Sequence, residues 1–130
     1  MPQQLNWDES QWPIVIVHFP DGPIIKPVME EYLAHILTLF ERKLPFAVIG
    51  LHETSGSAMD PETRVYAASF NKKYHAQFGA YMRGLAIVST SMLARTALMA
   101  IHWLSPFPYP TKAFKTQKEA LAWIQARLGS

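Results

Sequence analysis

The sequence predicts an α/β protein built on a single open, mostly parallel sheet of four or five strands with four helices. Short, continuous apolar runs recur at Ile14–Val17, Phe46–Ile49 and Leu85–Val88, a pattern typical of strands that are covered on both faces. Longer segments with apolar residues at steps of three and four separate these runs, which indicates amphipathic helices. Such alternation of strands and helices favours a parallel sheet with helices packed on its faces.

The first helix is expected between the first two strands, over residues 29–43. Its apolar face consists of Met29, Tyr32, Leu33, Ile36, Leu37 and Phe40. Acidic Glu30 and Glu31 in the first turn, and basic Arg42 and Lys43 in the last, match the helix dipole. The second helix is expected to start at Asp60-Pro61, where an N-cap acceptor precedes a proline, and to end near Gly79.

The last third of the chain predicts two more helices and an edge strand. A third helix follows Ser91 and reaches about Leu104, and a fourth follows Thr116 and runs through Leu128. Between them, Thr111–Lys115 is a short strand whose lysines suit a sheet edge. With right-handed crossovers, the four parallel strands are expected in the spatial order 2-1-3-4. The segment Leu5–Trp7 either pairs antiparallel at an edge, as a fifth strand, or stays outside the sheet.

Composition supports one domain that spans residues 1–130, because the 49% of hydrophobic residues supply enough apolar surface to offset the chain entropy. The formal net charge of +2 is small, so no nucleic-acid partner is expected. The absence of cysteine excludes disulfides, thiolate zinc sites and a cysteine nucleophile, and it indicates a reducing compartment.

Two further features favour a cytoplasmic protein that is not inserted into a membrane. The segment Met1–Gln4 lacks the basic and apolar regions of a secretory signal. The one membrane-like stretch, Gly84–Leu104, is interrupted by Ser89-Thr90-Ser91, Arg95 and His102. These interruptions suit a buried strand followed by a helix better than one spanning helix.

Three local features resemble a known family. They are the strand Gly84–Val88 after a long helix, the closing strand Lys112–Thr116 that leads into the helix Lys118–Ile124, and the order of elements along nearly the whole chain. The chain resembles the STAS (sulfate transporter and anti-sigma-factor antagonist) domains, in particular the bacterial SpoIIAA-like and STAS/Sec14-like proteins. The resemblance implies a SpoIIAA-like fold and a non-enzymatic role.

The resemblance also points to a phosphorylation loop. In anti-sigma-antagonist members, the turn after the second parallel strand holds an Asp-Ser-Ser-Gly motif whose serine a partner kinase phosphorylates. The corresponding segment is Glu53-Thr54-Ser55-Gly56-Ser57, in which Glu replaces Asp and Thr replaces the first Ser. Ser55 and Ser57 are therefore the candidate regulatory positions.

Polar residues gather where the parallel strands are expected to end, which is the usual ligand edge of such sheets. A polar-ligand rim would consist of His52, Glu53, Thr54, Ser89, Thr90 and Ser91. Alternatively, these side chains only cap helices and form turns. His52-Glu53 lacks the second histidine of a His-Glu-x-x-His helix, and no Gly-x-Ser-x-Gly segment occurs, so we expect no metal, no cofactor and no catalytic residue.

The helix over 92–104 is apolar almost all round, and the rigid Pro106–Pro110 turn that follows carries two aromatic residues. Something must cover the additional apolar face: the terminal helix, another subunit or a lipid-like ligand. The candidate interaction surface consists of Arg95, Met99, His102, Trp103, Phe107 and Tyr109.

The sequence thus favours a non-catalytic cytoplasmic binding or regulatory module that acts through protein interaction. Its partner would be another protein or a second copy in a homodimer. One alternative is a module with an apolar pocket for a small molecule or lipid, as the Sec14-type branch of the resemblance implies, and a third hypothesis is an unrecognised enzyme. A filled interior favours the first hypothesis, and an apolar cavity against the helix over 92–104 favours the second.

Overall fold

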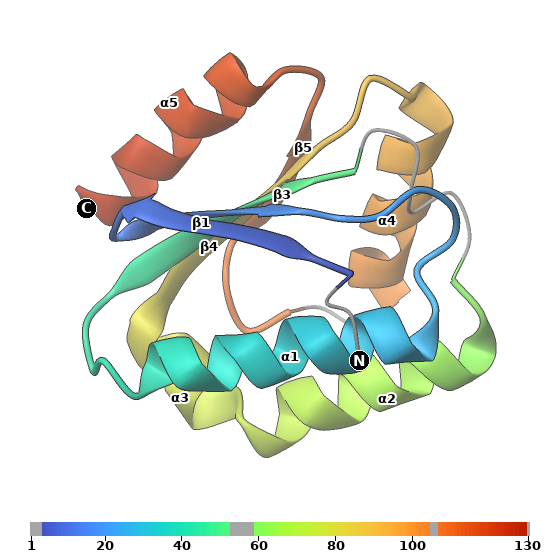
Figure 1. The fold of residues 1–130 in the computed structure, drawn as a ribbon, viewed down its shortest axis with the longest axis horizontal. Coiled ribbons are helices and arrows are strands. Elements are labelled where there is room, and N and C mark those ends of the chain that lie inside the picture. The colour runs from blue at the N-terminus through green and yellow to red at the C-terminus, as the bar shows by residue number, and fades with distance from the viewer. Residues whose placement is uncertain (1–3, 53–58, 105–106, 130) are drawn as a thin grey trace.

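The computed structural model describes residues 4–52, 59–104 and 107–129 (Figure 1). The described residues form one sheet of five strands in the order β1-β2-β3-β4-β5. The strands are β1 (Asn6–Gln11), β2 (Ile14–His18), β3 (Phe46–Leu51), β4 (Met82–Val88) and β5 (Thr111–Phe114). The helices are α1 (Lys26–Phe40), α2 (Pro61–Lys73), α3 (His75–Tyr81), α4 (Met92–Leu104) and α5 (Gln117–Leu128).

Strand β1 is the fifth strand, the one of the two alternatives for Leu5–Trp7 in which this segment joins the sheet. It runs antiparallel to β2, with Asn6 opposite His18 and Trp7 opposite Val17. The other three pairings are parallel, so the sheet is open and mostly parallel, as the sequence predicts. Every residue of β3 is buried, which explains why the central strands are apolar throughout rather than alternating.

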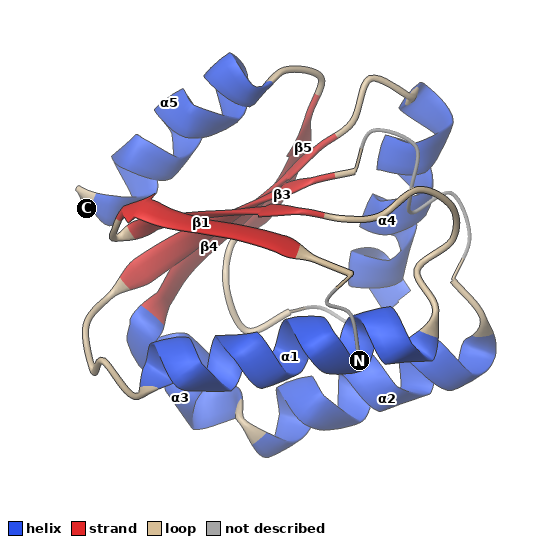
Figure 2. Cartoon of the chain, viewed as in Figure 1, coloured by secondary structure: helices blue, strands red, loops and turns tan. Residues whose placement is uncertain are grey.

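The expected strand order 2-1-3-4 is wrong, because the parallel strands follow one another in sequence order. The crossovers all step in one direction, so crossovers of one hand place every connecting helix on the same face of the sheet. Figure 2 shows the result, with α1, α2 and α3 beneath the sheet and α5 above it. An order of 2-1-3-4 would have put α1 on the face opposite to α2.

The first helix is shifted toward the N-terminus relative to the prediction. It starts at Lys26 with a proline in its first turn and ends at Phe40, so it has no acidic first turn and no basic last turn. Lys43 lies beyond the helix, in the left-handed region at a φ of 55°. Glu31 has a different role, since its carboxylate accepts the backbone N–H groups of Gln4 (3.0 Å) and Leu5 (2.8 Å) and so anchors the segment before β1.

The second predicted helix is broken in two, which raises the number of helices to five. The break lies at Tyr74, whose φ of −106° and ψ of 24° are not helical. Phe70 packs on Tyr74 across the break, with ring centroids 4.6 Å apart. Because α3 takes a new direction, Phe78 reaches the core and is only 1% exposed.

Each face of the sheet carries its own core. Residues Val15, Val17, Val48, Leu85 and Ile87 face α1, α3 and α4. Residues Ile14, Ile16, Ala47, Ile49 and Ala86 face α5, which contributes Ala120 and Ile124. The ring of Trp123 lies so close to Gly84 that a Cβ at this glycine would be 3.3 Å from the ring. No helix among the described residues is long and apolar enough to cross a membrane.

Candidate functional site

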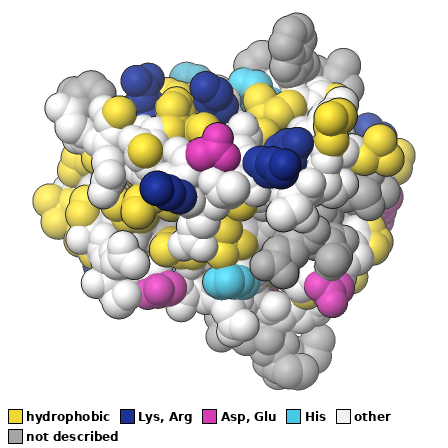
Figure 3. Space-filling model, turned by 90° about the horizontal axis from the view of Figure 1, so that it is seen from above, with side chains coloured by type: hydrophobic (Ala, Val, Ile, Leu, Met, Phe, Trp, Pro, Cys, Tyr) yellow, Lys and Arg dark blue, Asp and Glu magenta, His cyan; other side chains and the backbone are white. Residues whose placement is uncertain are grey.

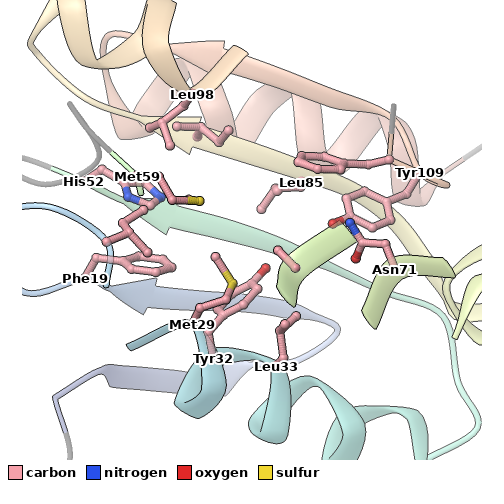
Figure 4. A pocket seen from close by; sticks show the side chains of 14 residues that line it. Phe19, Met29, Tyr32, Leu33, His52, Met59, Asn71, Leu85, Leu98 and Tyr109 are labelled. Carbon is pink, nitrogen blue, oxygen red and sulfur yellow. The ribbon is translucent and has the colours of Figure 1, made fainter. Parts of the chain in front are cut away.

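A cavity of about 80 Å³ lies between the larger core face of the sheet and helices α1, α2 and α4 (Figure 4). Its walls are mostly apolar. They are formed by Phe19, Ile24, Met29, Tyr32, Leu33, His52, Met59, Ala67, Asn71, Leu85, Ile87, Leu98, Phe107 and Tyr109. We call this space the α1–α4 pocket.

The spacing of residues along β4 and α2 determines which of their side chains line this pocket. Leu85 and Ile87 are two positions apart on β4, so both project from the same face of the sheet. Ala67 and Asn71 are four positions apart on α2 and therefore share one side of that helix. The small side chain of Ala67 leaves room where a larger residue would fill the space.

His52 occupies the end of the pocket next to β3, where it is 4% exposed. Its ring stacks on Phe19 with centroids 4.1 Å apart, and its backbone N–H donates to the Val88 carbonyl at 2.8 Å. Gly50 permits this placement, because a Cβ there would lie 3.0 Å from His52 Nε2. Burial lowers the pKa of His52 to about 3, so the ring is neutral at neutral pH.

Two tyrosines bring hydroxyl groups into this apolar setting. Tyr32 and Tyr109 are each 8% exposed, and burial raises the pKa of both, with a further rise at Tyr109 from the nearby Tyr32. Both hydroxyls therefore stay protonated. Figure 4 shows Asn71 beside Tyr109 at one end of the pocket, with His52 and Phe19 at the other end.

Only part of the predicted polar rim contributes to the pocket. Ser91 caps α4, since its Oγ accepts the backbone N–H of Ala94 at 3.1 Å, and Ser89 Oγ accepts the backbone N–H of Ser91 at 3.2 Å. Ser89 is buried, whereas Thr90 is exposed. These three residues fit the capping and turn alternative, and His52 alone of the described rim residues lines the pocket.

The predicted phosphorylation loop and the rest of the rim lie outside the described residues. This applies to Glu53, Thr54, Ser55 and Ser57. Phosphorylation of Ser55 or Ser57 therefore stays a prediction from the resemblance.

Several described members of the predicted interaction surface make contacts within the chain. Arg95 Nη1 donates to the Ser89 carbonyl at 2.6 Å, and Met99 is partly buried against the core. His102 Nδ1 accepts the backbone N–H of Phe107 at 3.2 Å and so holds the turn back against α4.

The aromatic half of that surface points inward. The rings of Phe107 and Tyr109 lie 5.5 Å apart and both line the pocket. Including Tyr109 in an exposed surface is wrong, because this side chain packs against Phe78 in the core. The side chain of Trp103 lies outside the described residues.

Helix α4 keeps an exposed apolar end. Met92 is 72% exposed and Leu93 is 78% exposed, whereas Ala94 and Leu98 are buried. The terminal helix α5 covers the opposite face of the sheet, so it does not cover Met92 or Leu93.

Sequence reasoning overlooked the polar contributions of Tyr32 and Asn71. The sequence places Tyr32 on the apolar face of the first helix, where its hydroxyl is the one polar group. Asn71 follows Ala67 by one helical turn, and this spacing places an amide on the side of α2 that faces the pocket. A polar atom at a core-facing position was the available signal in both cases.

Comparison with protein-family models finds no match, and no curated protein matches the chain. The fold is similar to the crystal structure of an uncharacterized protein from the DUF3478 family, with a SpoIIAA-like fold, from Shewanella loihica PV-4. The two chains are 17% identical, the alignment covers 92% of this chain and 91% of that chain, and the TM-score is 0.60. This likeness confirms the SpoIIAA-like fold.

Proposed function

We propose that this chain, with its SpoIIAA-like fold, is a non-catalytic module that binds a small, mostly apolar molecule in the α1–α4 pocket. The observation that carries the proposal is the cavity itself, which is bounded by Leu98 of α4 and by the Phe107 and Tyr109 rings. Native interiors are packed as densely as organic crystals and contain few voids larger than a water molecule. A half-open space of about 80 Å³ lined by apolar side chains is room that side-chain packing leaves for a small molecule.

The size of the pocket favours a small occupant over a lipid chain. Sites for drug-sized ligands measure roughly 300–1,000 Å³, and an engineered cavity of about 150 Å³ accepts benzene. The α1–α4 pocket, at about 80 Å³, is smaller than both. Met29 and Met59 line it, and flexible methionine side chains change rotamer readily, which leaves room for a single ring after modest adjustment.

The composition of the lining supports a non-catalytic role. His52 is its only imidazole, and the described residues of the lining include no Ser, Thr, Cys, Asp or Glu beside it. A general base with a pKa of about 3 is also too weak to remove protons efficiently near neutral pH. Ligand binding without catalysis is therefore the function that this lining supports.

Methyl NMR with benzene as the probe tests the proposal. We expect saturable shifts for the methyl groups of Leu85, Ile87 and Leu98, because these side chains line the pocket. Ala67→Phe should abolish the shifts by filling the cavity with a ring. Ala122→Phe is the matched control, since Ala122 is an exposed residue of α5 on the other face of the sheet.

The results of this titration either support or overturn binding in the pocket. Saturable shifts that disappear in Ala67→Phe and persist in Ala122→Phe support the pocket. Shifts that stay linear with benzene concentration, or that survive unchanged in Ala67→Phe, overturn it.

A second candidate function is protein interaction, with a second copy of the chain as the partner. The exposure of Met92 and Leu93 at the start of α4 favours it, because adjacent large apolar side chains in water are typical of contact surfaces. A cytoplasmic location remains part of this proposal and rests on the sequence alone. The two candidate functions use different parts of α4 and are compatible.

A further inference from the structure

We infer that the molecule bound in the α1–α4 pocket is neutral and carries a hydrogen-bonding group that it places between Tyr109 and Asn71. This inference rests on the proposed function and adds the chemistry of the ligand to it. Three features of the pocket carry it: the absence of charge in its described lining, the unused polar groups within it, and the position of two of those groups, on Tyr109 and Asn71, at one end.

The first feature is electrostatic. Among the described residues that line the pocket, none is Lys, Arg, Asp or Glu. A charged ligand would leave water without gaining an ion pair from these residues, and burial of an unpaired charge is strongly unfavourable. The one titratable cation-forming side chain, His52, is 4% exposed and remains neutral at neutral pH. The pocket therefore selects against carboxylates and amines of the same shape.

The second feature is unused hydrogen-bonding capacity. In the described part of the chain, no hydrogen bond joins the Tyr32 hydroxyl, the Tyr109 hydroxyl or the Asn71 amide to another group. The two tyrosines are each only 8% exposed, but their hydroxyls are not fully enclosed, because Trp7 Nε1 is the only fully buried side-chain polar atom without a partner among the described residues. A ligand that fills the pocket would cover these polar atoms, and most buried polar side-chain groups in folded proteins have a partner. A ligand with a hydroxyl, carbonyl or amide group would supply the missing partner.

The third feature is position. Asn71 from α2 and Tyr109 from the segment before β5 meet at one end of the pocket, and apolar side chains such as Leu98 and Leu85 form the wall between them and His52 (Figure 4). Tyr109 offers an O–H donor and an acceptor, and Asn71 offers an amide N–H and a carbonyl. A ligand with a polar tip and an apolar body fits this arrangement, with its tip at Tyr109 and its body toward Phe19.

Phenol and benzene, which differ by one hydroxyl group, test the hydrogen bond. We expect phenol to bind roughly 3-fold to 10-fold more tightly than benzene, as one additional hydrogen bond allows. In Tyr109→Phe this advantage should disappear while benzene affinity stays within about twofold. Asn71→Leu is a second variant of similar shape, and Tyr66→Phe is the matched control, because Tyr66 lies on α2 outside the pocket lining.

Butanamide and butanoate test neutrality, because they have the same number of heavy atoms and differ in charge. Butanamide should produce saturable methyl shifts at Leu85 and Leu98, and butanoate should bind at least about 10-fold more weakly at pH 7. Equal affinities for the pair contradict the inference, and so does a lack of binding by butanamide when benzene binds.

The results distinguish this inference from the proposed function. If benzene binds and phenol binds no better, or if the phenol advantage survives in both Tyr109→Phe and Asn71→Leu, the pocket exists but its assigned polar end is wrong. If neither benzene nor phenol binds, the proposed function itself fails.

Discussion

At the scale of single residues, the pocket combines apolar packing with polar atoms that packing alone does not require. His52 stacks on Phe19 over Gly50, and Tyr32 and Tyr109 carry hydroxyls into the core. Burial of such groups is costly unless they are paired. Such groups should leave measurable signatures in stability, which the next two predictions describe for His52 and Tyr109.

The first prediction concerns His52 and acid. Its pKa is about 3 in the folded protein and near 6.5 in the unfolded chain, so the unfolded state alone binds this proton as the pH falls from 6.5 toward 3. Stability is then lost at up to about 1.4 kcal/mol per pH unit, or about 2 kcal/mol between pH 7 and pH 5. In urea unfolding at the two pH values, His52→Gln should lose about 2 kcal/mol less than the parent.

His75→Gln is the control for this prediction, because His75 is exposed at the start of α3. Its pH dependence should match that of the parent. An equal acid sensitivity of the parent and His52→Gln would show that His52 is protonated in the folded state.

The second prediction is that Tyr109→Phe stabilises the protein without ligand. The hydroxyl makes no hydrogen bond within the described residues and belongs to a side chain that is only 8% exposed, so its removal relieves part of a desolvation penalty. The free energy of unfolding should rise by about 0.5–1 kcal/mol. Urea unfolding checks this, and a loss of more than about 1 kcal/mol would mean that the hydroxyl has a stabilising partner.

At the scale of elements, the sequence predicted the types of helices and strands better than their ends and neighbours. Apolar runs located β2, β3 and β4, and the Thr116 cap located α5, where Thr116 Oγ1 accepts the backbone N–H of Glu119 at 3.2 Å. The sequence does not reveal the helix break at Tyr74, because the helical spacing of aromatic residues continues across it from Phe70 to Phe78. Helical periodicity does not record where a backbone changes direction.

The third prediction tests the packing of α5 on the smaller core face. Ile124 is 0% exposed, whereas Trp123 is partly buried beside Gly84. Ile124→Ala should lower the free energy of unfolding by about 2–5 kcal/mol, and Trp123→Ala by less than the roughly 3–5 kcal/mol of a fully buried tryptophan. Gln125→Ala, at an exposed position, should stay within about 0.5 kcal/mol of the parent. An Ile124→Ala variant as stable as the parent would contradict this packing.

At the scale of the whole molecule, strand order and the pocket depend on contacts that one sequence does not reveal. Both 2-1-3-4 and 1-2-3-4 orders satisfy the same alternation of strands and helices, and they differ in which face each helix covers. The pocket forms because α1, α2 and α4 pack over one face of the sheet. The sequence alone does not show which face each helix covers, so it does not show that Tyr32 and Asn71 line the same pocket. On the α5 side of the molecule, Figure 3 shows Lys and Arg side chains that are separated by other side chains.

The fourth prediction is weak self-association through the start of α4. Met92 and Leu93 present adjacent apolar side chains, and a twofold dimer needs only one self-complementary patch. Association also costs several kcal/mol in lost freedom, so the dimer should form only at high concentration. Light scattering over a concentration series should show a rising mass for the parent and a constant monomer mass for Leu93→Glu.

Leu44→Glu is the matched control, because Leu44 is 53% exposed in the loop after α1, away from α4. This variant should associate like the parent. A parent that stays monomeric at every concentration would remove the second copy as a partner for this surface.

The most direct test of ligand binding is a crystal structure of the protein under xenon pressure, because xenon occupies dry apolar cavities and is visible by its anomalous scattering. We predict a xenon site in the α1–α4 pocket, in contact with Leu85 and Leu98, in the parent and in Ala122→Phe but not in Ala67→Phe. A parent crystal without xenon in this pocket, with side chains filling the space, would contradict the proposed function.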